Sequence, residues 1–251
     1  MAGKRKIIFY CLIFVIAAAY LTLAYFFIFY RIGAAGLKAP VGQDSYILGS
    51  EKTTAKNLTY AALGDSLTAG VGASIYQESY PYLLALDLAA RGDKTITLKN
   101  FSNPGDKTSD LINNLLAPAI ASKPDLVTLL IGVNDVYDNV SPAVFKKNYQ
   151  SILDRLTKET TAKIYLINLP FVGSSELLLK PYDYYFYGQI GKFNEIIREL
   201  AVAYNLKYID LATPALAESK TNQSYYSGDL FHPSASGYKF WAKIIYDDIN
   251  Q

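Results

Sequence analysis

The sequence predicts a three-layer α/β/α sandwich around a parallel sheet, preceded by one transmembrane helix. Short runs of branched and aromatic residues alternate with longer segments whose apolar residues recur at helical spacing, and an apolar stretch opens the chain. Strict alternation of β and α elements implies right-handed crossovers, which cover both faces of the sheet with helices. The 251 residues leave enough chain after the apolar stretch for one domain with its own core.

The N-terminal stretch predicts a membrane anchor. Residues 7–30 carry no charge, and a helix of that length crosses a hydrocarbon core of about 30 Å. Lys4, Arg5 and Lys6 precede it, so the positive-inside bias places residues 1–6 in the cytoplasm and the folded domain outside it, at the cell membrane. A cleaved signal peptide is the alternative, although the apolar run exceeds the usual length of such a segment, about 7 to 15 residues.

Residues 31–56 are rich in Gly, Ala, Thr and Lys and predict a tether without regular structure, so the folded domain is expected at 57–251. Five runs predict parallel strands, at Leu58–Leu63, Thr95–Phe101, Leu126–Ile131, Ile164–Leu169 and Lys207–Leu211. Five segments predict helices, at Tyr80–Arg91, Ser109–Ala121, Pro142–Glu159, Ile190–Tyr204 and Lys239–Ile249. The third helix has a recognisable start, because Ser141 can cap it and Pro142 suits its first position.

Composition excludes several classes of function. A net charge of +2 from nearly balanced acids and bases does not provide the positive field that a nucleic-acid partner requires. The single cysteine, Cys11, lies inside the apolar stretch, so the folded domain has neither an internal disulfide nor a thiol nucleophile. The single histidine, His232, rules out a multi-histidine metal site and must be any imidazole base. We expect neither a metal nor an organic cofactor.

Two motifs supply a candidate nucleophile and its base. Gly64-Asp65-Ser66-Leu67 follows the first predicted strand, at the sheet edge where open parallel sheets place ligands, although the same letters also suit an ordinary turn or helix cap. Near the C-terminus, Asp229 stands three residues before His232 and can reach its Nδ1–H around one turn. The Nε2 atom of His232 is then free to take the proton of Ser66.

Two further turns offer hydrogen-bond donors of the kind that an oxyanion requires. Gly105, after the second predicted strand, can present its backbone N–H, and Asn134, after the third, can present its side-chain amide. Asp65 and Asp135 lie in the same turns, and we interpret them as turn-stabilising residues rather than catalytic acids. Each turn by itself also suits an ordinary βα connection.

Together these pieces resemble the SGNH, or GDSL, family of hydrolases, whose sequence blocks carry Ser, Gly, Asn and His in that order. The matching segments are Gly-Asp-Ser-Leu-Thr-Ala-Gly at 64–70, Gly105, Gly-Val-Asn-Asp at 132–135 and Asp229-x-x-His232, while Pro104 departs from the usual small or polar residue. The resemblance implies a flavodoxin-like fold and a serine ester hydrolase. It also implies a Ser66–His232–Asp229 triad and an oxyanion hole formed by Ser66 N–H, Gly105 N–H and Asn134 Nδ2.

The substrate stays open at this point. Residues 171–188, rich in Leu, Tyr and Phe, could form an apolar lid or acyl pocket, or the interior-packed start of the next helix. Acyl esters of lipids, as for a lysophospholipase or lipase, suit an apolar pocket beside a membrane. The alternatives are an O-deacetylase of cell-surface polysaccharide or peptidoglycan and an inactive tethered binding module. The sequence does not indicate an oligomeric state.

Overall fold

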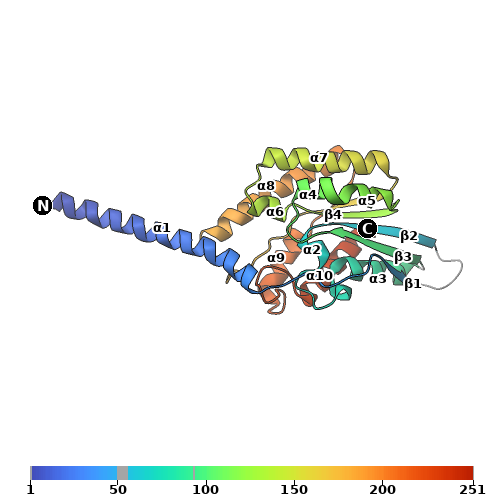
Figure 1. Cartoon of the computed structure of the whole chain (residues 1–251), viewed down its shortest axis with the longest axis horizontal. Helices are drawn as coiled ribbons and strands as arrows, with labels where there is room; N and C mark the ends of the chain where they lie inside the picture. Colours follow the sequence, from blue (N-terminus) through green and yellow to red (C-terminus); the bar gives the residue numbers. More distant parts are fainter. Residues whose placement is uncertain (1, 50–55, 93, 251) are drawn as a thin grey trace.

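The computed structural model describes residues 2–49, 56–92 and 94–250, and it contains a central sheet with helices on both faces (Figure 1). In that part of the chain the sheet has six strands in the order β1-β3-β2-β4-β5-β6. The five strands expected from the sequence are present and pair in parallel, at β2 (Lys56–Gly64), β3 (Lys94–Ser102), β4 (Leu126–Leu130), β5 (Lys163–Ile167) and β6 (Lys207–Ile209). The predicted fold class is therefore confirmed.

The expected number of five strands is wrong, because Tyr46–Gly49 forms a sixth strand, β1. This strand lies antiparallel to β3, with Tyr46 opposite Leu98 and Gly49 opposite Thr95. It falls within the segment expected to lack regular structure. Only Leu48 of its four residues is buried, so a short edge strand of this kind leaves no alternating pattern in the sequence.

The central strands are apolar because they are covered on both sides. All residues of β4 are buried, as are the last five residues of β2. Figure 1 shows α7 and α8 on one face with α4 and α5, and α3 and α10 on the other with α9. The helix bounds are α3 Tyr80–Gly92, α4 Thr108–Asp110, η2 Leu111–Leu115, α5 Leu116–Ala121, α6 Val133–Tyr137, α7 Pro142–Glu159, α8 Tyr182–Ala203, α9 Ala212–Thr221 and α10 Ala235–Ile249.

Two helices show how well local sequence predicts their ends. Helix α7 has the predicted bounds, since Ser141 caps it by accepting a hydrogen bond from Val144 N and a proline opens its first turn. Helix α8 begins at Tyr182, well before the predicted start at Ile190. Its first turns are stabilised by packing, because the ring of Phe186 stacks on that of Tyr137 at 4.1 Å.

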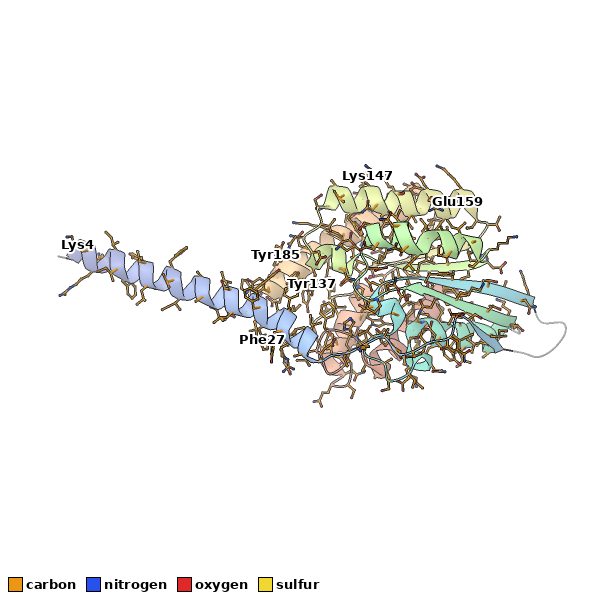
Figure 2. All side chains as sticks on the ribbon, viewed as in Figure 1. Lys4, Phe27, Tyr137, Lys147, Glu159 and Tyr185 are labelled. Carbon is orange, nitrogen blue, oxygen red and sulfur yellow. The ribbon has the colours of Figure 1, made fainter. Side chains whose placement is uncertain are left out.

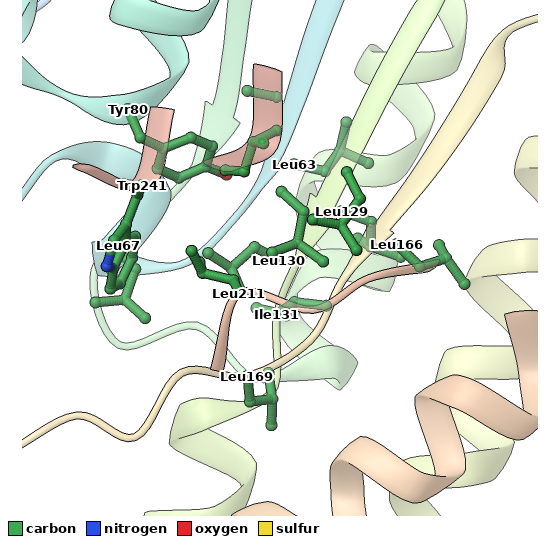
Figure 3. Packing of buried hydrophobic residues seen from close by; sticks show 14 of the residues in the cluster. Leu63, Leu67, Tyr80, Leu129, Leu130, Ile131, Leu166, Leu169, Leu211 and Trp241 are labelled. Carbon is green, nitrogen blue, oxygen red and sulfur yellow. The ribbon is translucent and has the colours of Figure 1, made fainter. Parts of the chain in front are cut away.

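The core reaches the turn that follows β2. Leu67, in the short helix α2 (Ser66–Ala69), is fully buried in the cluster that contains Leu63, Leu211 and Trp241 (Figure 3). The indole Nε1 of Trp241 donates to Tyr225 OH at 2.7 Å, so the polar atom of this large side chain is satisfied. The position of Ser66 is thus set by packing on the residue next to it.

Helix α1 (Ala2–Ala34) extends away from the sheet, with Lys4 near its far end (Figures 1 and 2). It is the one helix, among the residues that the structure describes, that is long and apolar enough to cross a membrane. Residues 4–23 are exposed, whereas Ala24 and Ile28 are buried against the folded domain. The C-terminal part of the apolar helix therefore packs on protein.

We expect Gly64→Ala to destabilise the protein. A Cβ atom at position 64 would lie 2.1 Å from Thr68 Oγ1 and 2.4 Å from Leu130 O, so the α2 turn or strand β4 would have to shift. The free energy of unfolding should fall by about 1–3 kcal/mol, as in other overpacked sites, which thermal unfolding of detergent-solubilised protein measures. The control is Gly191→Ala in α8, where a Cβ meets nothing within 4 Å, and stability should rise by up to about 1 kcal/mol. Equal stability of the two variants would contradict this expectation.

Candidate active site

The structure brings Ser66, His232 and Asp229 into one hydrogen-bonded row. His232 Nε2 lies 2.9 Å from Ser66 Oγ, and His232 Nδ1 lies 2.5 Å from Asp229 Oδ2. All three side chains are buried, with Asp229 only 1% exposed. A serine, an imidazole and a carboxylate in this order are the parts of a proton-transfer relay that can activate a hydroxyl nucleophile.

The β2–α2 turn positions Ser66 at the carboxyl end of β2. Asp65 caps α2, because its Oδ1 accepts a hydrogen bond from Leu67 N at 3.0 Å. The short helix ends at Gly70, whose φ of 85° lies in the left-handed region that favours glycine. The hydroxyl of Ser66 therefore projects from a turn that is constrained at both ends.

A second turn shapes the acid and the base together. Asp229 Oδ1 accepts hydrogen bonds from the backbone N–H groups of Phe231 and His232, each at 2.9 Å, and from Ser227 Oγ at 2.8 Å. Asp229 Oδ2 is left to face His232 Nδ1. This arrangement favours the tautomer in which Nδ1 carries the proton and Nε2 presents its lone pair to the serine.

Burial alone would raise the pKa of Asp229, but the hydrogen bonds and charge of His232 and the N–H groups of the turn outweigh it, so the pKa lies below its ordinary value. The carboxylate therefore stays ionised at neutral pH. An ionised carboxylate beside Nδ1 stabilises the imidazolium that forms when Nε2 takes a proton.

The two predicted oxyanion donors follow the strands on either side of β2. Gly105 comes after β3 with a φ of 89°, and nothing lies within 4 Å of where its Cβ would be. Asn134, in α6 after β4, donates from Nδ2 to Asp106 O at 2.9 Å, which holds its amide against the Gly105 loop. Since the strand order is β3-β2-β4, these donors flank Ser66 at one edge of the sheet.

Two supporting residues were not predicted from the sequence. Ser227 holds Asp229, as described above, and Thr108 joins the two donor loops. The backbone N–H and the hydroxyl of Thr108 donate to the buried carboxylate of Asp135, at 2.9 and 2.6 Å. The spacing Ser-x-Asp at 227–229 is a local signal that could have identified the first, whereas the second depends on a contact between distant loops.

Residues 171–188 are only partly a loop. Val172, Leu177 and Leu178 are buried, and the part from Tyr182 onward is the start of α8. That half of the segment matches the interior-packed alternative, while Tyr184 stays 70% exposed.

Among the residues that the structure describes, no group of three His, Cys, Asp or Glu side chains could hold a metal ion.

Comparison with known proteins places the similarity in the domain that follows α1. The model of the GDSL-like Lipase/Acylhydrolase family matches residues 62–240. The spore germination lipase LipC of Bacillus licheniformis is 30% identical over 206 residues, which cover 72% of this chain and 92% of that protein. The solved lipase/acylhydrolase from Enterococcus faecalis is 26% identical, with a TM-score of 0.63, and covers 76% of this chain and 95% of its own. The acetyl xylan esterase AlAXEase is 25% identical, with a TM-score of 0.61 and coverages of 76% and 100%.

Asp65, next to the candidate nucleophile, is an unusual carboxyl group. It is 1% exposed, and its Oδ2 has no hydrogen-bond partner among the described residues. Burial raises the pKa of Asp65 to about 7. The hydrogen bond from Leu67 N lowers this pKa, and the negative charge of Asp135 raises it by a smaller amount. Its capping bond supports a structural role in the turn, as does the Thr108 contact for Asp135.

Replacing Asp65 with Asn should reduce the pH dependence of stability. Between about pH 4 and the folded pKa of about 7, folded protein keeps a proton that the unfolded chain releases, so the free energy of unfolding falls as pH rises through this interval. Thermal unfolding should show a larger drop from pH 5 to pH 8 in the wild type than in Asp65→Asn. Asp44→Asn, at an exposed carboxylate, should keep the wild-type drop. Equal drops in the wild type and Asp65→Asn would show that Asp65 does not carry this proton.

Proposed function

The chain belongs to the GDSL-like lipase/acylhydrolase family, and from that premise we propose that it is a membrane-anchored serine ester hydrolase acting through an acyl-enzyme on Ser66. The observation that carries the proposal is the position of His232, whose two ring nitrogens lie 2.9 Å from Ser66 Oγ and 2.5 Å from Asp229 Oδ2. A merely structural histidine would not need a serine hydroxyl and an ionised carboxylate on its opposite nitrogens.

In the proposed mechanism His232 Nε2 takes the proton of Ser66 as Oγ attacks the ester carbonyl carbon. The negative charge that develops on the carbonyl oxygen is stabilised by Ser66 N–H, Gly105 N–H and Asn134 Nδ2. His232 then gives its proton to the leaving alkoxide, which departs as an alcohol. A water molecule, deprotonated by the same nitrogen, then attacks the acyl carbon, and as the bond to Ser66 Oγ breaks His232 returns the proton to Oγ, which releases the carboxylic acid and restores free Ser66.

The proposed location is the cell membrane, with a single pass and the catalytic domain outside the cytoplasm. Residues 1–6 would be cytoplasmic, 7–30 would form the span and 57–251 the hydrolase domain. The basic residues before the span support this orientation. The burial of Ala24 and Ile28 on the folded domain supports a retained helix over a signal peptide cleaved at its end, because removal of α1 would expose the apolar surface on which these two residues pack.

For the substrate we propose acyl esters of lipids. The lipase named among the relatives, LipC, supports this class, as does the anchor, which keeps the domain beside a bilayer. A second candidate, O-deacetylation of a cell-surface polysaccharide or peptidoglycan, is favoured by the similarity to an acetyl xylan esterase at 25% identity. The two differ in the length of acyl chain that must fit beside Ser66.

We expect Ser66→Ala to abolish both ester hydrolysis and labelling by a fluorophosphonate probe, which reacts only with an activated serine hydroxyl. The measurement is turnover of p-nitrophenyl esters together with gel fluorescence of the labelled full-length protein. Ser175→Ala, which removes an exposed serine hydroxyl outside the row, is the matched control and should leave both readouts unchanged. Full activity of Ser66→Ala would refute the nucleophile, and a wild type that is folded but never labelled would favour the tethered binding module.

Acyl-chain preference should separate the two substrate classes. If the acyl chain is buried on binding, each CH₂ contributes about 0.8 kcal/mol, so burial of two of them already raises kcat/KM by roughly tenfold. We therefore expect p-nitrophenyl octanoate to be hydrolysed at least about tenfold more efficiently than the acetate. A strong preference for the acetate would overturn the lipid proposal in favour of O-deacetylation.

A further inference from the structure

Helix α1 contacts the first turn of α8 and the residues just before it. Tyr20 OH donates to Lys180 O at 2.8 Å, and Tyr182 OH donates to Leu21 O at 2.9 Å. The rings of Tyr25 and Tyr182 lie 5.8 Å apart. One turn further along α1 toward its C-terminus, Ala24 and Ile28, which are one helical turn apart, are buried. The start of α8 is therefore fastened to one face of the apolar helix.

The contacts begin too early along α1 for the whole span to lie free of the domain. From Lys4 to Ala19, the part before the first contact, the helix is ~24 Å long at ~1.5 Å per residue, less than the hydrocarbon core of about 30 Å. A tilt of the helix shortens this span further. If α1 crosses a bilayer from residue 7, the turn that carries Tyr20 and Leu21 lies ~20 Å along the span, short of the outer edge of the core, and it brings the start of α8 into the outer part of the bilayer.

The start of α8 has the chemistry of a membrane interface. Tyr184 is 70% exposed and Tyr185 is 45% exposed, and the ammonium group of Lys180 lies 5.5 Å from the centre of the Tyr184 ring. Tyrosine and lysine are side chains that gather where hydrocarbon meets headgroups, because each has an apolar body and a polar end. Figure 2 shows Tyr185 at the side of the domain that α1 passes.

The same side of the domain carries the candidate site. Figure 1 shows α2 and α6, which follow β2 and β4, on the side of the sheet toward α1. A row of aromatic rings connects the site to this side. The ring of His232 lies 5.0 Å from that of Phe231, which lies 5.2 Å from that of Tyr137. The Tyr137 ring in turn stacks on Phe186 in the second turn of α8. The carboxyl edge of the sheet thus faces the direction in which the anchor leaves.

We propose that residues 180–185, together with the adjoining turn of α1, form a membrane-contact surface that enters the outer interface of the bilayer. The surface sets the carboxyl edge of the sheet against the lipid, so that an ester lipid reaches Ser66 from the bilayer. This last consequence rests on the proposed function, whereas the contact with lipid does not. The occupant of the surface is lipid, because the short free length of α1 brings the surface to the bilayer without any further protein.

Depth-dependent quenching tests the contact. In full-length Cys11→Ser protein reconstituted into vesicles of phosphatidylcholine and phosphatidylglycerol, a nitrobenzoxadiazole dye is attached at Tyr184→Cys or, as a matched control, at Val202→Cys. Val202 is 79% exposed in the last turn of α8, ~27 Å away along the helix axis. We expect nitroxide-bearing lipids to quench the dye at position 184 and not at 202. Equal quenching at both positions would overturn the proposal. A dye at position 184 that is shielded from aqueous iodide but not quenched by nitroxide lipid would also overturn it, because that result would indicate a protein partner.

A second measurement links the surface to substrate delivery. For Tyr184→Asp and the control Val202→Asp, the rate on an ester lipid in the vesicles is divided by the rate on a soluble p-nitrophenyl ester. We expect the ratio to fall by at least about fivefold for Tyr184→Asp, because a carboxylate at the interface opposes insertion, and to stay at the wild-type value for Val202→Asp. An unchanged ratio for Tyr184→Asp would overturn delivery from the bilayer. Wild-type protein that hydrolyses neither ester would refute the proposed function and leave the quenching result to decide the surface by itself.

Discussion

The hydrogen bond between His232 Nδ1 and the buried carboxylate of Asp229 is the interaction on which the rest of the site depends. A carboxylate that is 1% exposed is costly unless its lone pairs are satisfied, and here one oxygen receives the N–H groups of its own turn while the other faces the imidazole. The turn therefore serves two purposes. It keeps the carboxylate ionised, and it directs the second imidazole nitrogen at Ser66.

The parallel sheet supplies the other half of the arrangement. Three strands that are neighbours in space, β3, β2 and β4, end at one edge, and each is followed by a turn with a different group, namely Gly105, Ser66 and Asn134. The turns are held together by polar contacts that do no chemistry themselves, such as the pair formed by Thr108 and Asp135. The close packing of the α2 turn against β4 is equally important. It leaves no room between Thr68 and Leu130 for a side chain at position 64, so the residue there is glycine.

The contacts between α1 and the folded domain bear on how the two can move relative to each other. A flexible tether would let the domain rotate freely above the membrane, as the composition of residues 31–56 suggested. In the structure Ala24 and Ile28 pack on the domain, and β1 pairs with β3 at the edge of the sheet. In the proposed arrangement this attachment orients the site toward the lipid rather than merely keeping it nearby.

The sequence alone determined the elements whose signals are local. The bounds of α7 follow from its cap and proline, the strands from their apolar runs, and the candidate residues from motifs that each end a strand. Tertiary structure decided the rest, because the deciding partners lie far away in the chain. Strand β1 exists only by pairing with β3, the early start of α8 depends on Phe186 packing against Tyr137, and α1 docks through contacts with residues 180 and 182. The hydrogen bond between Ser66 and His232 joins residues 166 positions apart, a distance that only the folded sheet closes.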